Sequence, residues 1–223
     1  MDINVNNIHI YYEKIGSGKP LIMLHGNGES SKIFHKAASE LQEDFTVYLP
    51  DSRDHGKSQV TNDLSYDNMA EDIFKFIEEL GLKEPIICGF SDGAITALLL
   101  AINHPEIPGA IIACGANSSP KGLKAPIRFF MKLNLFFTGS VKTKMMLTQP
   151  NISGEMLGRI TCPTLISCAS NDMIKESDSE FIAKNIKGSE FSIQKGENHG
   201  SYIVNSKKIA KIVTNFCSSK NII

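Results

Sequence analysis

The pentapeptide GFSDG at residues 89–93 places a serine between two glycines. A short apolar run at residues 85–88 precedes it, and a helix-like run at residues 94–103 follows it. A strand that turns sharply into a helix leaves little room beside the backbone, so small residues are needed two positions before and after the central one. Ser91 is therefore expected to project over the end of a sheet as a nucleophile, above the positive end of a helix. The alternative is an ordinary tight strand-to-helix turn.

A serine hydroxyl is a poor nucleophile at neutral pH, so it needs a base, and the base needs a carboxylate that orients it. Two later apolar runs end in such groups: residues 164–168 lead to Asp172, and residues 190–194 lead to His199. The carboxyl ends of parallel strands meet at one edge of a sheet. The sequence therefore predicts that Ser91, His199 and Asp172 act together as nucleophile, base and orienting acid. Asp178 is the rival acid, but it lies at a predicted helix start, where the helix dipole favours an acidic residue.

Further segments resemble those of the α/β-hydrolase-fold serine hydrolases. LIMLHGNG at residues 21–28 resembles the family's strand followed by His-Gly-x, and PDSRDHGKS at residues 50–58 resembles its D-x-R-G-H-G-x-S loop. HPE at residues 104–106 resembles the turn after the nucleophile helix, and the order Ser91, Asp172, His199 is the family's order. The resemblance spans nearly the whole chain. It implies an α/β fold with a mostly parallel, doubly wound sheet.

The resemblance also implies a mechanism of acyl transfer. Ser91 attacks, His199 moves the proton, and Asp172 orients the imidazole and stabilises its charged form. The backbone N–H groups of Asn27 and Asp92 are expected to form the oxyanion hole that binds the developing negative charge. No cofactor and no metal ion are expected.

Other histidines and two departures from the family pattern bear on this assignment. His25 and His55 match family loop positions whose usual role is structural. His9 and His35 are expected on the surface or on a helix, and His104 at a helix end. Asp54 and Ser170 stand where the family has glycine, which puts the local turn geometry in doubt but not the chemistry. Aspartate tolerates a positive φ better than most residues.

Apolar runs of four to six residues alternate with longer amphipathic segments, which indicates βα units around a mostly parallel sheet. We predict strands at residues 8–12, 21–24, 46–49, 85–88, 110–113, 164–168 and 190–194. Helices are predicted at residues 31–41, 66–80, 94–103, 177–186 and 201–216. In the second helix the apolar side chains share one face at i, i+3, i+4 spacing, as expected for a helix that covers a sheet.

Residues 115–159, called here the lid segment, lie outside this βα rhythm and are rich in Phe, Met and Leu. Family lids are usually inserted at this point, and this one is short. We predict a reduced, mostly helical lid whose apolar side chains, Phe136 and Phe137 among them, bind the apolar part of a substrate. The alternative is that these side chains are ordinary core.

The composition limits the classes of partner and the number of domains. With 223 residues we expect one domain, residues 1–223, that includes the lid segment at 115–159. The formal net charge is −1 and no block of like charge stands out, so neither nucleic acid nor a membrane is expected as a partner. The five cysteines are scattered, as expected for free thiols in a reducing compartment. We expect a soluble cytoplasmic protein, a monomer or homodimer, with a small-molecule substrate that has an apolar part.

The leading functional hypothesis is a serine hydrolase that cleaves a small carboxylic ester, thioester or lactone. The fold also hosts C–C bond hydrolases, cofactor-free haloperoxidases, lyases, amidases and lipases, and the fold alone does not choose among them. A non-catalytic ligand-binding module is an alternative of a different class. A merely structural protein is a third, and it requires Ser91, Asp172 and His199 to lie far apart.

Overall fold

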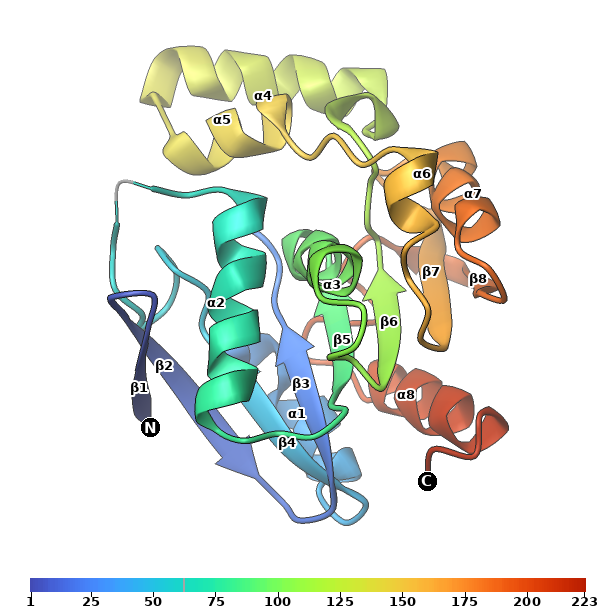
Figure 1. Ribbon diagram of the computed structural model, residues 1–223. Helices are drawn as coiled ribbons and strands as arrows, with labels where there is room; N and C mark the ends of the chain where they lie inside the picture. Colours follow the sequence, from blue (N-terminus) through green and yellow to red (C-terminus); the bar gives the residue numbers. More distant parts are fainter. Residues whose placement is uncertain (62) are drawn as a thin grey trace.

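The computed structural model describes residues 1–61 and 63–223. Within these ranges one eight-stranded sheet has the order β1-β2-β4-β3-β5-β6-β7-β8 (Figure 1). The pairs from β4 across to β8 are parallel, whereas β1 and β2 join the sheet as antiparallel strands. The strands are β1 (Asp2–Val5), β2 (Ile8–Ile15), β3 (Lys19–Leu24), β4 (Phe45–Pro50), β5 (Ile86–Phe90), β6 (Ala110–Cys114), β7 (Thr164–Asn171) and β8 (Glu190–Asn198).

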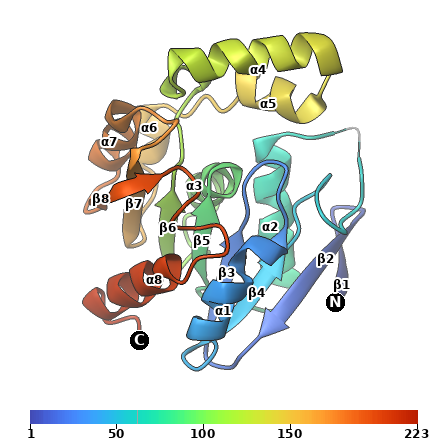
Figure 2. The ribbon, with the colours of Figure 1, turned by 180° about the vertical axis from the view of Figure 1, so that it is seen from behind.

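Helices cover both faces of the sheet, as a doubly wound fold requires. One face carries α2 (Tyr66–Glu79), α3 (Asp92–Asn103) and α7 (Glu176–Asn185), and the other carries α1 (His35–Leu41), preceded by the 3₁₀ turn η1 (Ser31–Phe34), and α8 (Lys208–Ser219) (Figures 1 and 2). Each face has its own buried apolar cluster, with Phe76 and Leu98 in the first and Phe34 and Phe216 in the second. All residues of β5 and β6 are buried, because helices cover both faces of these strands. Strands buried in this way are apolar throughout.

The predicted fold class and the seven predicted strands are confirmed, and the structure adds one strand. β1 forms a hairpin with β2 through Asn6 and Asn7, which have φ values of 50° and 61°. Two consecutive positive φ angles match the right-handed twist of a two-residue hairpin, and asparagine tolerates them. An Asn-Asn pair between two short runs was the signal for this strand.

The start predicted for the last helix, residue 201, is wrong. Residues 201–205 form turns, and α8 begins only at Lys208. The Asn198 side chain accepts hydrogen bonds from the backbone N–H groups of Gly200 (3.2 Å) and Ser201 (3.0 Å). Such local side-chain bonds give the backbone an alternative to the helix.

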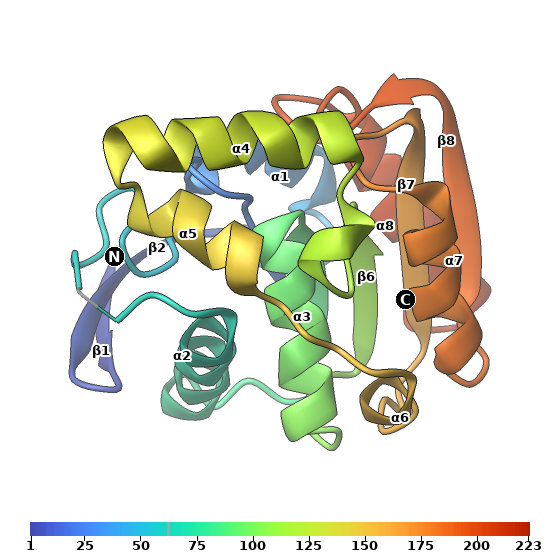
Figure 3. The same ribbon diagram turned by 90° about the horizontal axis from the view of Figure 1, so that it is seen from above.

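The lid segment is helical, as predicted. It contains the 3₁₀ turn η2 (Pro120–Gly122) and the helices α4 (Ala125–Thr138), α5 (Val141–Thr148) and α6 (Gly154–Leu157). Seen from above, α4 and α5 lie side by side across the end of the molecule where the parallel strands terminate (Figure 3). Among the helices of the described ranges, none has both the length and the apolar character needed to cross a bilayer.

Candidate active site

Ser91 lies at the sharp turn between β5 and α3. Its φ and ψ are 53° and −114°, a conformation that a non-glycine residue adopts only under constraint. The flanking glycines have no room for a side chain. A Cβ on Gly89 would lie 2.2 Å from the Gly93 carbonyl oxygen, and a Cβ on Gly93 would lie 2.1 Å from the Leu24 carbonyl oxygen. The spacing that the sequence showed is therefore a steric requirement of this turn.

The three residues predicted to act together do lie together. Nε2 of His199 is 3.0 Å from Oγ of Ser91, and Nδ1 of His199 is 2.6 Å from Oδ1 of Asp172. These residues come from the ends of β5, β7 and β8. The third hypothesis, that the residues lie far apart in a merely structural protein, is thus wrong on geometry.

Asp172 is held as a charged hydrogen-bond acceptor. Its carboxylate also accepts from the backbone N–H groups of Ala169 (3.1 Å) and Ile174 (3.0 Å). Burial alone would raise its pKa, but the hydrogen bond and charge of His199, with these two N–H groups, hold the pKa of Asp172 below its usual value. A charged Asp172 fixes the proton on Nδ1 of His199, so the free lone pair on Nε2 faces Ser91.

The end of β6 supports both the serine and the imidazole. The Ser91 backbone N–H donates to the Cys114 carbonyl oxygen at 2.8 Å. Gly115, with a φ of 67°, packs against the imidazole so closely that a Cβ there would lie 2.8 Å from Cε1 of His199. A side chain at position 115 would displace the ring.

The two predicted oxyanion-hole residues are tied to each other. Nδ2 of Asn27 donates to the Asp92 carboxylate at 2.8 Å, which joins the loop after β3 to the first residue of α3. Within residues 1–61 and 63–223, neither backbone N–H of this pair has a hydrogen-bond acceptor. Unpaired N–H groups at a helix start are suited to binding a negative charge.

The Asp92 side chain is a component that sequence reasoning missed. It is buried, and besides Asn27 it accepts from the Tyr66 hydroxyl at 2.8 Å. Burial raises the pKa of Asp92, while the two hydrogen bonds oppose that rise. The signal was a charged residue at the start of an otherwise apolar helix, directly after the proposed nucleophile.

Two further charged side chains surround the site. The Glu29 carboxylate accepts from the Gly26 backbone N–H at 3.0 Å, and burial raises its pKa. Burial is the main reason that the pKa values of His25 and His55 are lowered, and the positive charge of partly buried Lys142 on α5 lowers them further. Burial also lowers the pKa of Lys142 itself. Sequence analysis identified no charged residue for substrate binding, because nothing in the sequence places α5 over these loops.

His25 and His55 act structurally, as the loop motifs predicted. His25 bonds the Gly26 carbonyl oxygen through Nδ1 (2.9 Å) and accepts from the Ser52 backbone N–H at Nε2 (3.0 Å). Burial lowers the pKa of His25 to about 4 and also lowers the pKa of His55. His55 bonds the Arg53 carbonyl oxygen through Nδ1 at 2.8 Å. Both rings therefore stay neutral at neutral pH.

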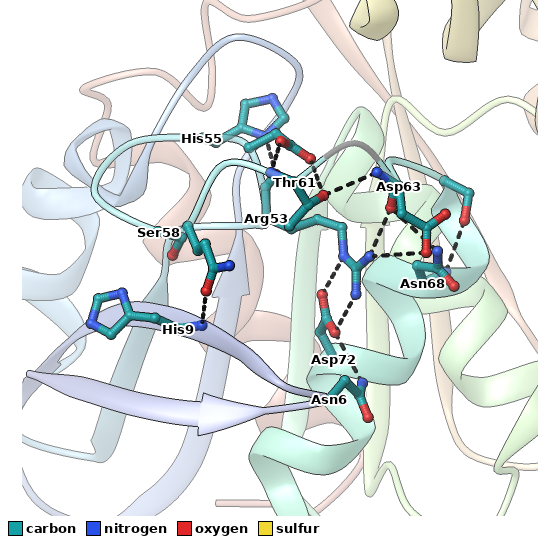
Figure 4. Close-up of polar contacts among 12 residues, drawn as sticks. Asn6, His9, Arg53, His55, Ser58, Thr61, Asp63, Asn68 and Asp72 are labelled. Atoms are coloured by element: carbon teal, nitrogen blue, oxygen red, sulfur yellow. Dashed lines mark hydrogen bonds and ion pairs between the residues drawn. The ribbon is translucent and has the colours of Figure 1, made fainter.

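The loop after β4 is clamped by an ion pair, drawn in Figure 4. The Arg53 guanidinium donates twice to the Asp72 carboxylate, each time at 2.7 Å, and Asn6 donates to the same carboxylate at 2.9 Å. Burial alone would lower the pKa of Arg53, but Asp72 raises it. Asp54, in place of the family's glycine, has a φ of 61°, and its carboxylate accepts from Thr61. The turn is therefore formed even though aspartate replaces the family's glycine at position 54.

The remaining candidates have other partners. The Asp178 carboxylate accepts from the backbone N–H and the hydroxyl of Ser118, at 2.7 and 2.8 Å, and so fastens the start of the lid segment to α7. His104 is the C-cap of α3 and pairs with Glu71. Ser170 is the other residue that departs from the family pattern, and its hydroxyl accepts from the Gly196 backbone N–H. The described residues hold no group of three His, Cys, Asp or Glu side chains placed to bind a metal ion.

An apolar cavity of about 340 Å³ lies between α4, α5 and the residue after Asp172. Phe136 and Phe137 are not among its lining residues. Their rings are 82% and 74% exposed and contact each other edge to face, so their role in substrate binding stays a prediction. The side chains that line the cavity are Ile127, Phe130, Met131, Asn134, Thr143, Met146 and Met173.

The comparisons with known proteins identify the fold family. A family described as alpha/beta hydrolase fold matches residues 19–209. This chain belongs to the α/β-hydrolase fold family. The mouse protein Serine hydrolase BPHL is 23% identical over 96% of this chain and 84% of its own length. The Bacillus subtilis protein Uncharacterized hydrolase YraK is 30% identical, but the match covers 47% of this chain and 40% of that protein.

Solved structures show the same fold over the whole chain. The enol-lactonase from Burkholderia xenovorans LB400 superposes with a TM-score of 0.81 at 16% identity, over 98% of this chain and all of that one. At this identity the likeness shows the α/β-hydrolase fold. The relatives of this α/β hydrolase include hydrolases and esterases, and its substrate is a separate question.

Proposed function

We propose that this α/β hydrolase cleaves a small carboxylic ester, thioester or lactone through a covalent acyl-enzyme on Ser91. One observation carries the proposal. Ser91, His199 and Asp172 form a continuous hydrogen-bonded chain, with distances of 3.0 and 2.6 Å, at a turn whose strained backbone presents a serine. Hydrolysis of esters and lactones through an acyl-serine uses this combination of nucleophile, proton carrier and oriented acid.

In the first half of the reaction, Oγ of Ser91 attacks the acyl carbon and its proton passes to Nε2 of His199. The bond from the acyl carbon to the leaving oxygen or sulfur then breaks, and the proton on His199 moves to that atom. Water attacks the acyl-enzyme in the second half, again giving its proton to His199, which returns it to Ser91 as the acid is released. Asp172 stabilises the imidazolium that forms twice in this cycle.

The negative charge that develops on the acyl oxygen needs donors in both halves. The backbone N–H groups of Asn27 and Asp92 are the proposed donors, and the hydrogen bond between their side chains keeps the two segments in place. Loss of one such donor costs about 2.7 to 4 kcal/mol in the barrier. Since mutation does not remove a backbone N–H group, the oxyanion hole is tested by substituting the Asn27 side chain, which bonds Asp92.

The apolar part of the substrate is assigned to the cavity of about 340 Å³, because Met173, which follows Asp172 in the chain, lines it and because most of its other lining side chains are apolar. Methionine is flexible and fits apolar groups of different shape. A cavity of this size suits a small molecule.

A fluorophosphonate probe tests the proposal. An activated serine attacks phosphorus as it attacks a carbonyl carbon, so we expect one adduct, on Ser91, and much slower labelling of the His199→Ala variant. Asp178→Asn is the matched control, because this rival carboxylate bonds Ser118 rather than His199. An adduct on another residue, or equal labelling without His199, would contradict the proposal. Turnover of a short p-nitrophenyl ester separates an enzyme from a ligand-binding module.

A further inference from the structure

The positive charge of this chain is concentrated in the lid segment. The whole sequence has 23 basic and 24 acidic residues, yet residues 115–154 contain six lysines and arginines and no aspartate or glutamate. The whole-chain charge of −1, on which the expectation of no membrane partner rested, hides this local excess. A basic segment of this kind attracts anionic surfaces.

The same segment has large apolar side chains in solvent. No residue of α4 is buried, and five of its apolar residues are at least 44% exposed. At 100° per residue these five fall within an arc of about 120° on one side of the helix. They are called here the outer lid face: Phe129, Phe130, Leu133, Phe136 and Phe137. Contiguous exposed apolar surface of this kind marks an interaction site.

A basic cavity of about 780 Å³ adjoins the outer lid face. Arg128 and Lys132 of α4 line it, on the flank of the helix next to the exposed rings, together with Lys121 and Lys175. No acidic side chain is among the residues that line it. Its remaining lining residues are Ser119, Pro120, Leu147, Thr148 and Asn151. Four cations with hydroxyl and amide groups suit a phosphate-bearing headgroup.

We infer that α4 docks on an anionic phospholipid surface, with the outer lid face inserted at the level of the acyl chains and the basic cavity around a lipid phosphate. A helix with aromatic residues on one side and lysine and arginine beside them lies in a bilayer interface in this way. The helix needs no rearrangement for this, because its apolar side chains are already exposed. The helix itself runs across the end of the molecule (Figure 3).

A second copy of the chain fits the outer lid face less well than a membrane does. A two-fold contact through α4 would bring two lid segments together, each with six cations and no acidic residue between residues 115 and 154. Like charges brought together at an interface are unfavourable. An anionic bilayer offers both the apolar layer and the opposite charge.

Vesicle flotation tests the inference without any need for turnover, so its failure and the failure of the proposed function are distinguishable. We expect the full chain to float with vesicles of phosphatidylglycerol and phosphatidylcholine, at least tenfold more than with phosphatidylcholine alone, and to be released by high salt. Arg128→Glu with Lys132→Glu should abolish the preference for the anionic lipid. Phe136→Ser with Phe137→Ser should lower binding at least tenfold.

The matched control reverses two exposed lysines on the opposite side of the molecule, Lys36→Glu on α1 and Lys211→Glu on α8, and it should bind vesicles like the wild type. Circular dichroism shows that each variant is folded. Equal binding by the Arg128 and Lys132 variant and the control would overturn the inference. So would a wild-type dimer in solution that the Phe136 and Phe137 variant breaks, because the outer lid face would then be an interface between copies.

Discussion

The half-buried turn at Ser91 and the exposed helix α4 are built in opposite ways. At Ser91 the backbone is strained, the neighbouring glycines have no space for a Cβ, and the serine hydroxyl lies within hydrogen-bond distance of His199. In α4 no residue is buried, and its largest side chains project into water.

This difference separates two kinds of requirement. The geometry around Ser91 must be held to fractions of an ångström, so the surrounding structure determines it and substitutions there are costly. The outer lid face is not needed for folding, so its aromatic residues are best explained by what they contact outside the molecule. Substitutions should therefore affect chemistry and folding in the first region, and binding in the second.

The largest expected effect is on turnover. Ser91→Ala should lower kcat for a p-nitrophenyl ester by about 10⁴-fold or more, because no other group in the mechanism can form the acyl-enzyme. The melting temperature should stay close to that of the wild type, since His199 is the hydroxyl's only hydrogen-bond partner among the residues that the structure describes. A Ser91→Ala variant with near wild-type turnover would show that the strained turn has no catalytic purpose.

A second substitution at the same turn should break the fold rather than the chemistry. Gly93→Ala places a Cβ 2.1 Å from the Leu24 carbonyl oxygen, so α3 must shift away from β3. We expect a loss of more than about 4 kcal/mol in the free energy of unfolding. The matched control is Gly139→Ala in the lid, where a Cβ meets nothing within 4 Å, although its φ of 64° adds some strain. Urea unfolding measures the free energy of unfolding of both variants. Equal losses in Gly93→Ala and Gly139→Ala would contradict the view that the turn is sterically constrained and the lid is not.

The glycines, the serine and the later carboxylate and histidine could be predicted from sequence because each is a local requirement, of a turn or of a strand end. The fold followed from the alternation of apolar and amphipathic runs. What could not be predicted depends on contacts between distant segments. The bond from Asn27 to Asp92 spans 65 positions, and the Tyr66 hydroxyl reaches the same carboxylate from a different helix.

The lid shows the other limit of sequence reasoning. Its helices and its apolar content were predicted, but the direction of the side chains was not, because an apolar stripe on a helix ordinarily faces the core. Phe136 and Phe137 were therefore expected in the substrate site. Because both rings are exposed, they are not part of the core. Whether they bind substrate still needs an experiment.

Acidification should lower the stability of the folded chain through the buried histidine His25. His25 has a pKa of about 4 in the folded chain against 6.5 for the free side chain, because burial disfavours its charged form. Between these two pH values the unfolded chain binds a proton on His25 that the folded chain does not bind. The free energy of unfolding therefore falls as the pH drops from about 6.5 to 4, by about 3 kcal/mol in all. Above pH 6.5 the contribution of His25 is constant. Urea unfolding at pH 7.5 and 4.5 measures the loss. The difference should be smaller in His25→Gln, and an unchanged difference would mean that His25 is not the buried neutral group.

The smallest expected effect on stability is in the lid, where two pairs of substitutions sharpen the contrast. Phe136→Ser with Phe137→Ser removes exposed rings, so the free energy of unfolding should change by no more than about 0.5 kcal/mol per site. Met131→Ser with Met146→Ser instead changes the wall of the apolar cavity between α4 and α5. For a soluble ester with a medium acyl chain, each lost apolar contact of about 1 kcal/mol raises KM roughly fivefold. We therefore expect a rise in KM for the methionine pair that is clearly larger than for the phenylalanine pair, with kcat little changed. If the phenylalanine pair gives the larger rise, these two rings close over the substrate during turnover, and the cavity is not where the acyl chain binds.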